Sequence, residues 1–129
     1  MATVYLAVNG TLMRGLELNE NLRKVGANFV REATTDAAYR LWTIGDRHPA
    51  MMRFQTGGRE IALEIWEVPD TAIATILRQE PPGLCIGSIT LADGEPMLGV
   101  LGEAYLCEGG TEITQWGGWR AYIASKNSA

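Results

Sequence analysis

The stretch Glu60-Ile61-Ala62-Leu63-Glu64-Ile65-Trp66-Glu67-Val68 is the clearest strand signal in the chain. Period-two alternation places its isoleucines and Leu63 on one face and Glu64 on the other, between Ala62 and Trp66. A carboxylate among apolar neighbours is costly to bury unless it is paired or protonated, and either state changes its pKa. Glu64 is therefore a candidate general base. The alternatives are a structural ion pair with an arginine and a half-exposed face on which Glu64 points to water.

Turn signals and further strand patterns surround this segment. Pro69-Asp70 starts a helix expected over 71–79, which Pro81-Pro82-Gly83 ends, and Asp93-Gly94 is a strong hairpin signal. Other strands are expected at 3–8, 28–33, 39–44, 51–55, 84–91 and 95–107, and a helix capped by Asn19 at 20–27. Seven strands and two helices in mixed order predict an α+β fold, a small, mixed, twisted β-barrel with helices at its ends.

Length and composition limit the classes of protein. The chain has 129 residues, a net charge of -4 and 47% hydrophobic residues, which fits a single domain, 1–129, with one core. This acidic balance argues against nucleic acid as a partner. The absence of an n-region, of an h-region and of a long apolar run argues against a signal peptide and a membrane span. The chain is therefore expected to be cytoplasmic, and no metal or other cofactor is expected.

The cysteine, histidine, arginine and lysine residues offer few candidates for catalysis. Cys85 and Cys107 lie in apolar stretches and are expected to be small buried hydrophobes. His48, the only histidine, lies in the polar loop Gly45–Pro49, where it is expected to be solvated. Nine arginines stand against two lysines, and the arginine fork suits carboxylates.

Three further features are candidates for a site. The turn Asn9-Gly10-Thr11-Leu12 follows an apolar strand, and successive amides in such a turn can bind an anion; an ordinary turn is the alternative. Glu80 ends the second expected helix, where the macrodipole raises a carboxyl pKa slightly. Glu103 shares a face of the expected strand 95–107 with Tyr105 and Cys107, buried or paired with an arginine.

The C-terminal segment Trp116-Gly117-Gly118-Trp119-Arg120-Ala121-Tyr122 is rich in aromatic residues. Its glycines allow close backbone packing, and Arg120 offers a fork to a carboxylate. The alternative is an aromatic plug that closes the barrel.

Several of these motifs occur, in the same order, in a known superfamily. The segment 8–15, VNGTLMRG, resembles the signature that opens γ-glutamylcyclotransferase-like proteins, and the strand, helix and Glu80 resemble their catalytic run. The chain is still more similar to the C-terminal domain of allophanate hydrolase. The matching stretches are 18–22, 26–30, 39–41, 64–69, 86–89, 91–94, Gly99 with Glu103, and 117–122.

This resemblance implies a pocket beside the first turn. Gly10, Thr11 and Leu12 would line it, and Glu80 would be the acid/base. In allophanate hydrolase the C-terminal domain is implicated in breaking down the carboxycarbamate left by the amidase domain, so Arg40 or Arg120 would bind a carboxylate of the substrate. Asn9 stands where the cyclotransferases have tyrosine, allophanate hydrolases usually have an apolar residue in place of Glu80, and no counterpart of the amidase Ser-Ser-Lys set occurs in this sequence.

The sequence therefore supports two hypotheses of different class. The first is an enzyme acting on a small carboxylated nitrogen compound, a carbamate or an amide, by glutamate general acid/base chemistry. The second is a non-catalytic domain that binds a small acid or works with a separate amidase; a γ-glutamyl amine cyclotransferase is a further alternative. The predicted catalytic residues are Glu80 and Glu64. The predicted residues around an anionic small-molecule substrate are Asn9, Gly10, Thr11, Leu12, Tyr39, Arg40, Trp119 and Arg120.

Overall fold

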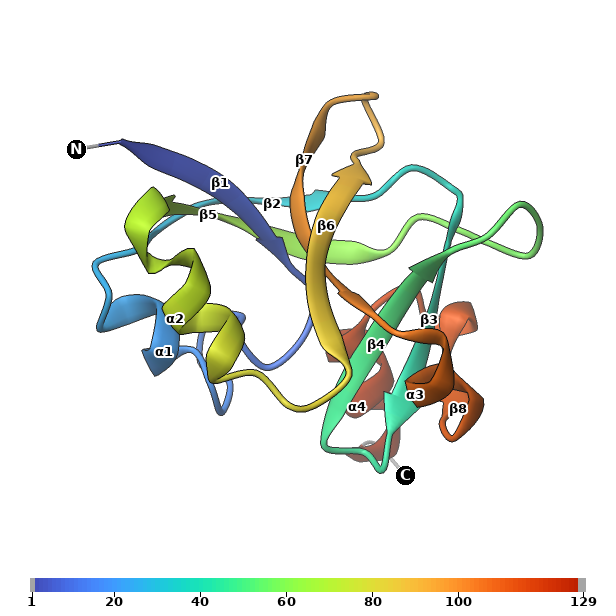
Figure 1. The fold of residues 1–129 in the computed structure, drawn as a ribbon. Helices are drawn as coiled ribbons and strands as arrows, with labels where there is room; N and C mark the ends of the chain where they lie inside the picture. The colour runs from blue at the N-terminus through green and yellow to red at the C-terminus, as the bar shows by residue number, and fades with distance from the viewer. Residues whose placement is uncertain (1, 128–129) are drawn as a thin grey trace.

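Two β-sheets flanked by short helices form the part of the chain that the computed structural model describes, residues 2–127 (Figure 1). The strands are β1 (Thr3–Val8), β2 (Asn28–Thr34), β3 (Tyr39–Ile44), β4 (His48–Arg53), β5 (Ala62–Pro69), β6 (Leu84–Thr90), β7 (Pro96–Gly102) and β8 (Thr111–Glu112). The helices are α1 (Glu20–Arg23), α2 (Ile73–Arg78), α3 (Ala104–Glu108) and α4 (Trp119–Asn127), with 3-10 turns at Asp70–Ala72 and Thr114–Trp116.

The larger sheet has the strand order β2-β5-β1-β7-β6. Strand β1 lies at its centre, antiparallel to β5 and parallel to β7. Leu6 of β1 and Ile65 and Val68 of β5 are buried in the core. The chain therefore leaves β1 in the middle of the sheet, and the turn that follows is surrounded by other elements.

The smaller sheet, with the order β4-β3-β8, packs against the larger one through β4 and β7. A Cβ on Gly102 would lie 2.7 Å from Cβ of Ala50, so the two strands approach closely at this point. The mixed α+β architecture is confirmed. The strands form two sheets rather than one closed barrel.

The strand expected over 95–107 is too long. Strand β7 ends at Gly102, and α3 follows with Glu103 as its N-cap residue. Glu103 and Tyr105 are exposed while Cys107 is buried, so these residues do not share a sheet face. Short apolar stretches suit a strand and a helix equally well by pattern, and here the glycines at 102 and 109–110 set the boundaries.

The loop expected over Gly45–Pro49 is shorter in the structure, because His48 and Pro49 belong to β4. Pro49 pairs with Thr43 of β3, and β4 is an edge strand of its sheet. An edge strand tolerates proline, since the missing N–H need not face a partner. His48 is consequently 7% exposed rather than solvated.

The N-terminal helix is shorter than expected, and the C-terminal segment, for which the sequence predicted no element, is a helix. The first helix is only Glu20–Arg23, and Asn19 makes no capping bond; its Nδ2 donates to the carbonyl of Leu12 at 2.8 Å instead. The aromatic tail is helix α4, whose Tyr122 hydroxyl donates to Asp46 at 2.6 Å.

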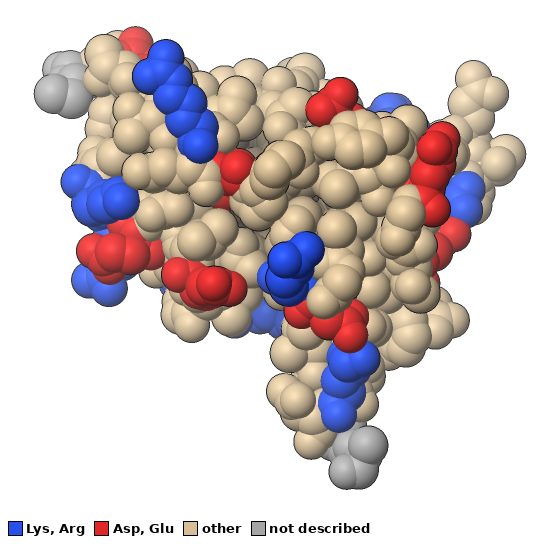
Figure 2. All heavy atoms as spheres, turned by 60° about the horizontal axis from the view of Figure 1, so that its bottom comes forward, with Lys and Arg blue, Asp and Glu red and all other residues tan. Residues whose placement is uncertain are grey.

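No helix among residues 2–127 is long and apolar enough to cross a membrane. On the face drawn in Figure 2, acidic and basic side chains are interspersed and form no patch of one sign.

Candidate functional site

The turn after β1 packs directly against β4. A Cβ on Gly10 would lie 2.6 Å from Cδ and 2.8 Å from Cγ of Pro49, distances that real contacts do not reach. Because the proline ring is rigid and lies in a strand, it cannot move aside cheaply. Glycine at position 10 therefore lets the turn lie beside Pro49, and this contact sets the shape of one wall of a pocket.

The amides of this turn are unused by the protein. Its carbonyls are bonded: that of Gly10 accepts from the amide of Met13 at 3.0 Å, and that of Thr11 from the amide of Leu18 at 2.9 Å. Within residues 2–127, the N–H groups of Gly10, Thr11 and Leu12 donate to no protein atom. Three successive amides are therefore left without a protein acceptor in a turn that lines the pocket, and such amides can bind an anion.

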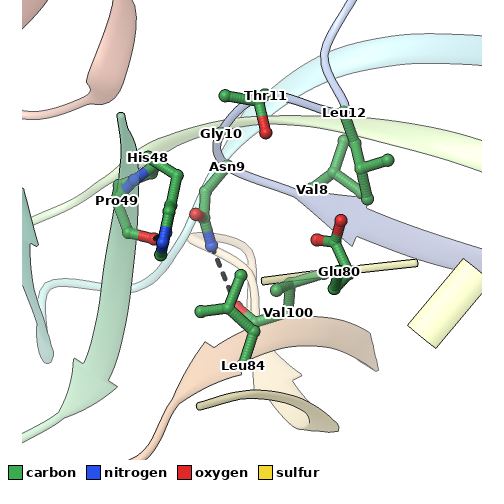
Figure 3. A pocket seen from close by; sticks show the side chains of 10 residues that line it. All are labelled: Val8, Asn9, Gly10, Thr11, Leu12, His48, Pro49, Glu80, Leu84 and Val100. Carbon is green, nitrogen blue, oxygen red and sulfur yellow. Dashed lines mark hydrogen bonds between the residues drawn. The ribbon is translucent and has the colours of Figure 1, made fainter. Parts of the chain in front are cut away.

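Glu80 lies opposite this turn, two residues after α2 (Figure 3). Its Oε2 atom is fully enclosed and is the only such side-chain oxygen or nitrogen in the described part of the chain without a hydrogen-bond partner. Its surroundings are apolar, with Val8, Leu12 and Leu84 among the residues that line the same pocket. Burial raises the pKa of Glu80 to about 7, so that near neutral pH the carboxyl both carries and releases a proton.

The enclosed part of the pocket has a volume of only about 10 Å³, which is room for about one water molecule. A groove of about 720 Å³ adjoins it and shares Thr11, His48 and Glu80 as lining residues. The exposed residues Glu17 and Arg47 also line the groove, so it carries one negative and one positive side chain besides Glu80. The groove, not the enclosed pocket, has room for a small polar molecule beside Thr11 and Glu80.

Glu64 has a different environment. Its carboxylate, 2% exposed, accepts hydrogen bonds from the amide of Arg14 at 2.9 Å, from Nε of Arg14 at 3.1 Å, from Nε1 of Trp66 at 3.1 Å and from Nη2 of Arg120 at 3.1 Å. Burial opposes ionisation, but these donors outweigh it and lower the pKa of Glu64. This is the ion pair that the sequence left open as an alternative. A catalytic role for Glu64 stays a prediction, and a carboxylate held ionised by four donors is a weak base.

The remaining predicted residues fall outside the Glu80 pocket. Trp119 and Arg120 line a separate groove of about 500 Å³ together with Glu64. Arg40 forms a two-point pair with Glu112 at 2.8 and 2.6 Å and lies over the ring of Phe54. The buried Tyr39 uses its hydroxyl to accept from the amide of Thr90 at 3.1 Å.

The structure thus divides the predicted residues into three groups: those at the Glu80 pocket, those around Glu64, and Tyr39 and Arg40, which lie outside both. Asn9, Gly10, Thr11 and Leu12 lie with Glu80. His48 at this pocket and Arg47 in the adjoining groove were not predicted to be there. The signal that could have found them is the Gly45-Asp46 turn between two strand-like runs, which indicates a hairpin and returns the chain to the first turn at position 48.

Substituting Gly10 tests the contact between the turn and β4. Gly10→Ala is expected to lower the free energy of unfolding by about 1–3 kcal/mol, because the new methyl group overlaps the ring of Pro49 and the backbone must shift. Urea denaturation measures the change. Gly109→Ala is the matched control, since its Cβ would meet nothing closer than the carbonyl oxygen of Leu106 at 3.9 Å. Equal stability of the two variants would contradict the close approach.

Comparison with known proteins identifies the family. The model of the allophanate hydrolase C-terminal domain matches residues 4–124. Urea amidolyase of Saccharomyces cerevisiae is 33% identical in an alignment of 128 positions that covers 94% of this chain and 7% of the yeast protein. The chain therefore spans a small part of the length of the curated relatives that it matches.

Solved structures agree with this assignment. A crystal structure of a uropathogenic E. coli-specific protein is 57% identical with a TM-score of 0.95, covering 96% of this chain and 98% of the other. Allophanate hydrolase of Kluyveromyces lactis is 30% identical with a TM-score of 0.88, covering 97% of this chain and 22% of the other. A γ-glutamyl cyclotransferase, with a TM-score of 0.52, 11% identity and coverage of 78% and 66%, shares the fold. The pocket beside β1 is thus set in a chain that belongs to the allophanate hydrolase C-terminal domain family.

Proposed function

We propose that this domain breaks down a small carboxylated nitrogen compound, a carbamate or an amide, with Glu80 as the proton donor. The observation that carries the proposal is the enclosed, unpartnered Oε2 of Glu80 in the same pocket as three free amides. One group supplies a proton near neutral pH, and the other supplies a site for a carboxylate oxygen. Of the two glutamates predicted from the sequence, Glu80 fits acid/base chemistry better, because a proton donor needs a pKa near the working pH.

N-carboxycarbamate is the proposed substrate, because its breakdown consumes protons. When one of its C–N bonds breaks, carbon dioxide leaves, and the electron pair remains on the nitrogen, which takes the proton of Glu80. The product is carbamate. After Glu80 is reprotonated from water, the same step on carbamate releases a second carbon dioxide and ammonia. The dianion and two protons thus yield two molecules of carbon dioxide and one of ammonia.

In the first step, the free amides at Gly10, Thr11 and Leu12 would hold the carboxylate that does not leave. Backbone donors bind an anion without a neutralising cation, and they are already oriented by the bonds that their carbonyls make. With the substrate anchored there, Glu80 is the neighbouring group that can reach the nitrogen.

A coupled assay tests this proposal. An amidase that hydrolyses allophanate supplies N-carboxycarbamate in solution, and the second ammonia is measured over time with and without the domain. The wild-type domain is expected to accelerate its release, and Glu80→Gln is expected to reduce the acceleration by about 10²–10⁴-fold, the usual contribution of a general acid.

Glu60→Gln is the matched control for this assay. It makes the same chemical change at an exposed residue that lines neither the pocket nor the groove. Its rate is expected to equal that of the wild type. Release at the spontaneous rate with the wild-type domain, or full acceleration by Glu80→Gln, would contradict the proposal.

The matched relatives favour a partner as part of the proposal. The region similar to this chain makes up 22% of the K. lactis allophanate hydrolase and 7% of the yeast urea amidolyase, so those proteins carry the domain within much longer chains. We propose that an amidase activity supplies the substrate here as well. Co-purification of an amidase with the wild-type domain and with Glu80→Gln alike, but no acceleration by either, would favour the non-catalytic alternative.

A further inference from the structure

His48 lies beside the turn on the side opposite Glu80. In Figure 3 the two side chains lie on either side of Asn9, whose Nδ2 donates to the carbonyl of Val100 at 2.9 Å. His48 is 7% exposed and lines both the enclosed pocket and the groove. Its ring thus borders the space between the free amides and Glu80.

The tautomer of His48 follows from its one hydrogen bond. Nδ1 lies 3.1 Å from the carbonyl oxygen of Pro49, and a carbonyl can only accept, so Nδ1 carries the hydrogen. In the neutral ring this leaves Nε2 as an acceptor. Within residues 2–127, Nε2 has no hydrogen-bond partner, and it is not among the fully enclosed atoms, so it keeps some accessible surface in a side chain that lines the pocket and the groove.

We propose that Nε2 of His48 accepts a hydrogen bond from the N–H of the substrate and so turns its nitrogen toward Glu80. This inference rests on the proposed function and adds a specificity to it. The site selects compounds with an N–H between two carbonyl carbons over compounds with a methylene group there. Three kinds of group then bind one small molecule. The turn amides donate to a carboxylate, Nε2 of His48 accepts from the N–H, and the Glu80 carboxyl donates its proton to the nitrogen lone pair.

The first test is direct, because the chain contains a single histidine. Long-range ¹H–¹⁵N NMR of protein with labelled histidine shows one ring, without ambiguity. The Nδ1–H tautomer is expected. The Nε2–H tautomer would overturn the inference, since Nε2 would then be a donor and could not accept from the substrate.

The second test compares two stable amides that differ only at the central atom. Biuret has an N–H between its carbonyl carbons, and malonamide has a methylene group. Wild-type protein is expected to bind biuret about fivefold more tightly, the fold-change that one net hydrogen bond gives. His48→Phe keeps a ring but removes the acceptor and is expected to bind both alike. His48→Gln is expected to restore the preference, because its Oε1 can accept.

Equal affinities of the wild type for the two amides, or no binding of either, would overturn the inference even if His48→Phe is poorly folded. Glu80→Gln is expected to keep the biuret preference, because Nε2 remains in place. The two proposals can therefore fail separately. Equal binding of biuret and malonamide by the wild type would contradict the role of His48, and unchanged turnover by Glu80→Gln would contradict the role of Glu80 as proton donor.

Discussion

Glu64→Ala is expected to lower the free energy of unfolding by about 2–4 kcal/mol, the largest destabilisation predicted for a side-chain truncation in this chain. The substitution removes a carboxylate that accepts from Arg14, Trp66 and Arg120. The buried indole N–H of Trp66 loses its acceptor, and two guanidinium groups are left facing each other. Both arginine side chains are nearly half exposed, which keeps the effect at the lower end of the range for buried pairs.

Urea denaturation at neutral pH measures this change. Glu32→Gln is the matched control: Glu32 also pairs with Arg14, at 2.8 Å, but its side chain is 73% exposed. An exposed pair contributes about 0–1 kcal/mol. If Glu64→Ala were no more destabilising than Glu32→Gln, the buried carboxylate would not organise this part of the fold.

The pKa of Glu64 also predicts the effect of acid. Because the folded-state pKa is lower than the usual value, the unfolded chain takes up a proton first as the pH falls. The stabilisation from Glu64 is complete above the unfolded-state pKa and is lost as the pH falls through the folded-state pKa.

Glu80→Gln is expected to raise stability in mildly alkaline solution by roughly 2–3 kcal/mol, since each pKa unit corresponds to about 1.4 kcal/mol and water reaches part of this side chain. Burial raises the pKa of Glu80 from 4.5 to about 7. The folded protein therefore holds a proton that the unfolded chain has lost, and wild-type stability should fall as the pH rises between about 4.5 and 7. Above that window the carboxylate is ionised without a partner.

Denaturation curves at a series of pH values provide the measurement. Glu80→Gln has no ionisable group at this position, so the fall in stability over this window should shrink, and the two proteins should be similar at the acidic end. Glu17→Gln, on the exposed side of the groove, should retain the wild-type profile. A wild-type profile in Glu80→Gln would show that Glu80 is ionised and solvated in the folded protein.

Glu64 and Glu80 show which properties of a residue the sequence can predict and which it cannot. Alternation along Glu60–Val68 identified Glu64 as a carboxylate among apolar residues, and it is buried. Its partners could not be predicted, because Arg14 and Arg120 are 50 and 56 residues away and only the folded chain places them there. For Glu80, helix position indicated a slight rise in pKa, whereas the larger rise comes from burial beside strands distant in sequence.

The same difference applies to the secondary structure. Segments with a regular pattern and clear turn residues, such as Thr3–Val8 and Tyr39–Ile44, have the predicted bounds. The segment 95–107, whose pattern is ambiguous, divides instead into β7 and α3, and the aromatic tail, for which no element was predicted, is helix α4. Local pattern does not reveal which neighbours will cover a segment, and those neighbours decide between strand and helix.

By itself, the sequence determined the α+β class, the family resemblance, the turn Asn9–Leu12 and the place of Glu80 just after a helix, because each depends on local pattern or on motif order. Tertiary structure alone decided that the turn amides have no protein acceptor, that Glu64 is held ionised by two arginines and that His48 lines the pocket. The physical reason is that free amides, ion pairs and burial depend on atoms from distant segments. Gly10 illustrates the local and the tertiary contribution. The sequence identifies it as a turn residue, and only the structure shows that the ring of Pro49 beside it leaves no room for a larger residue.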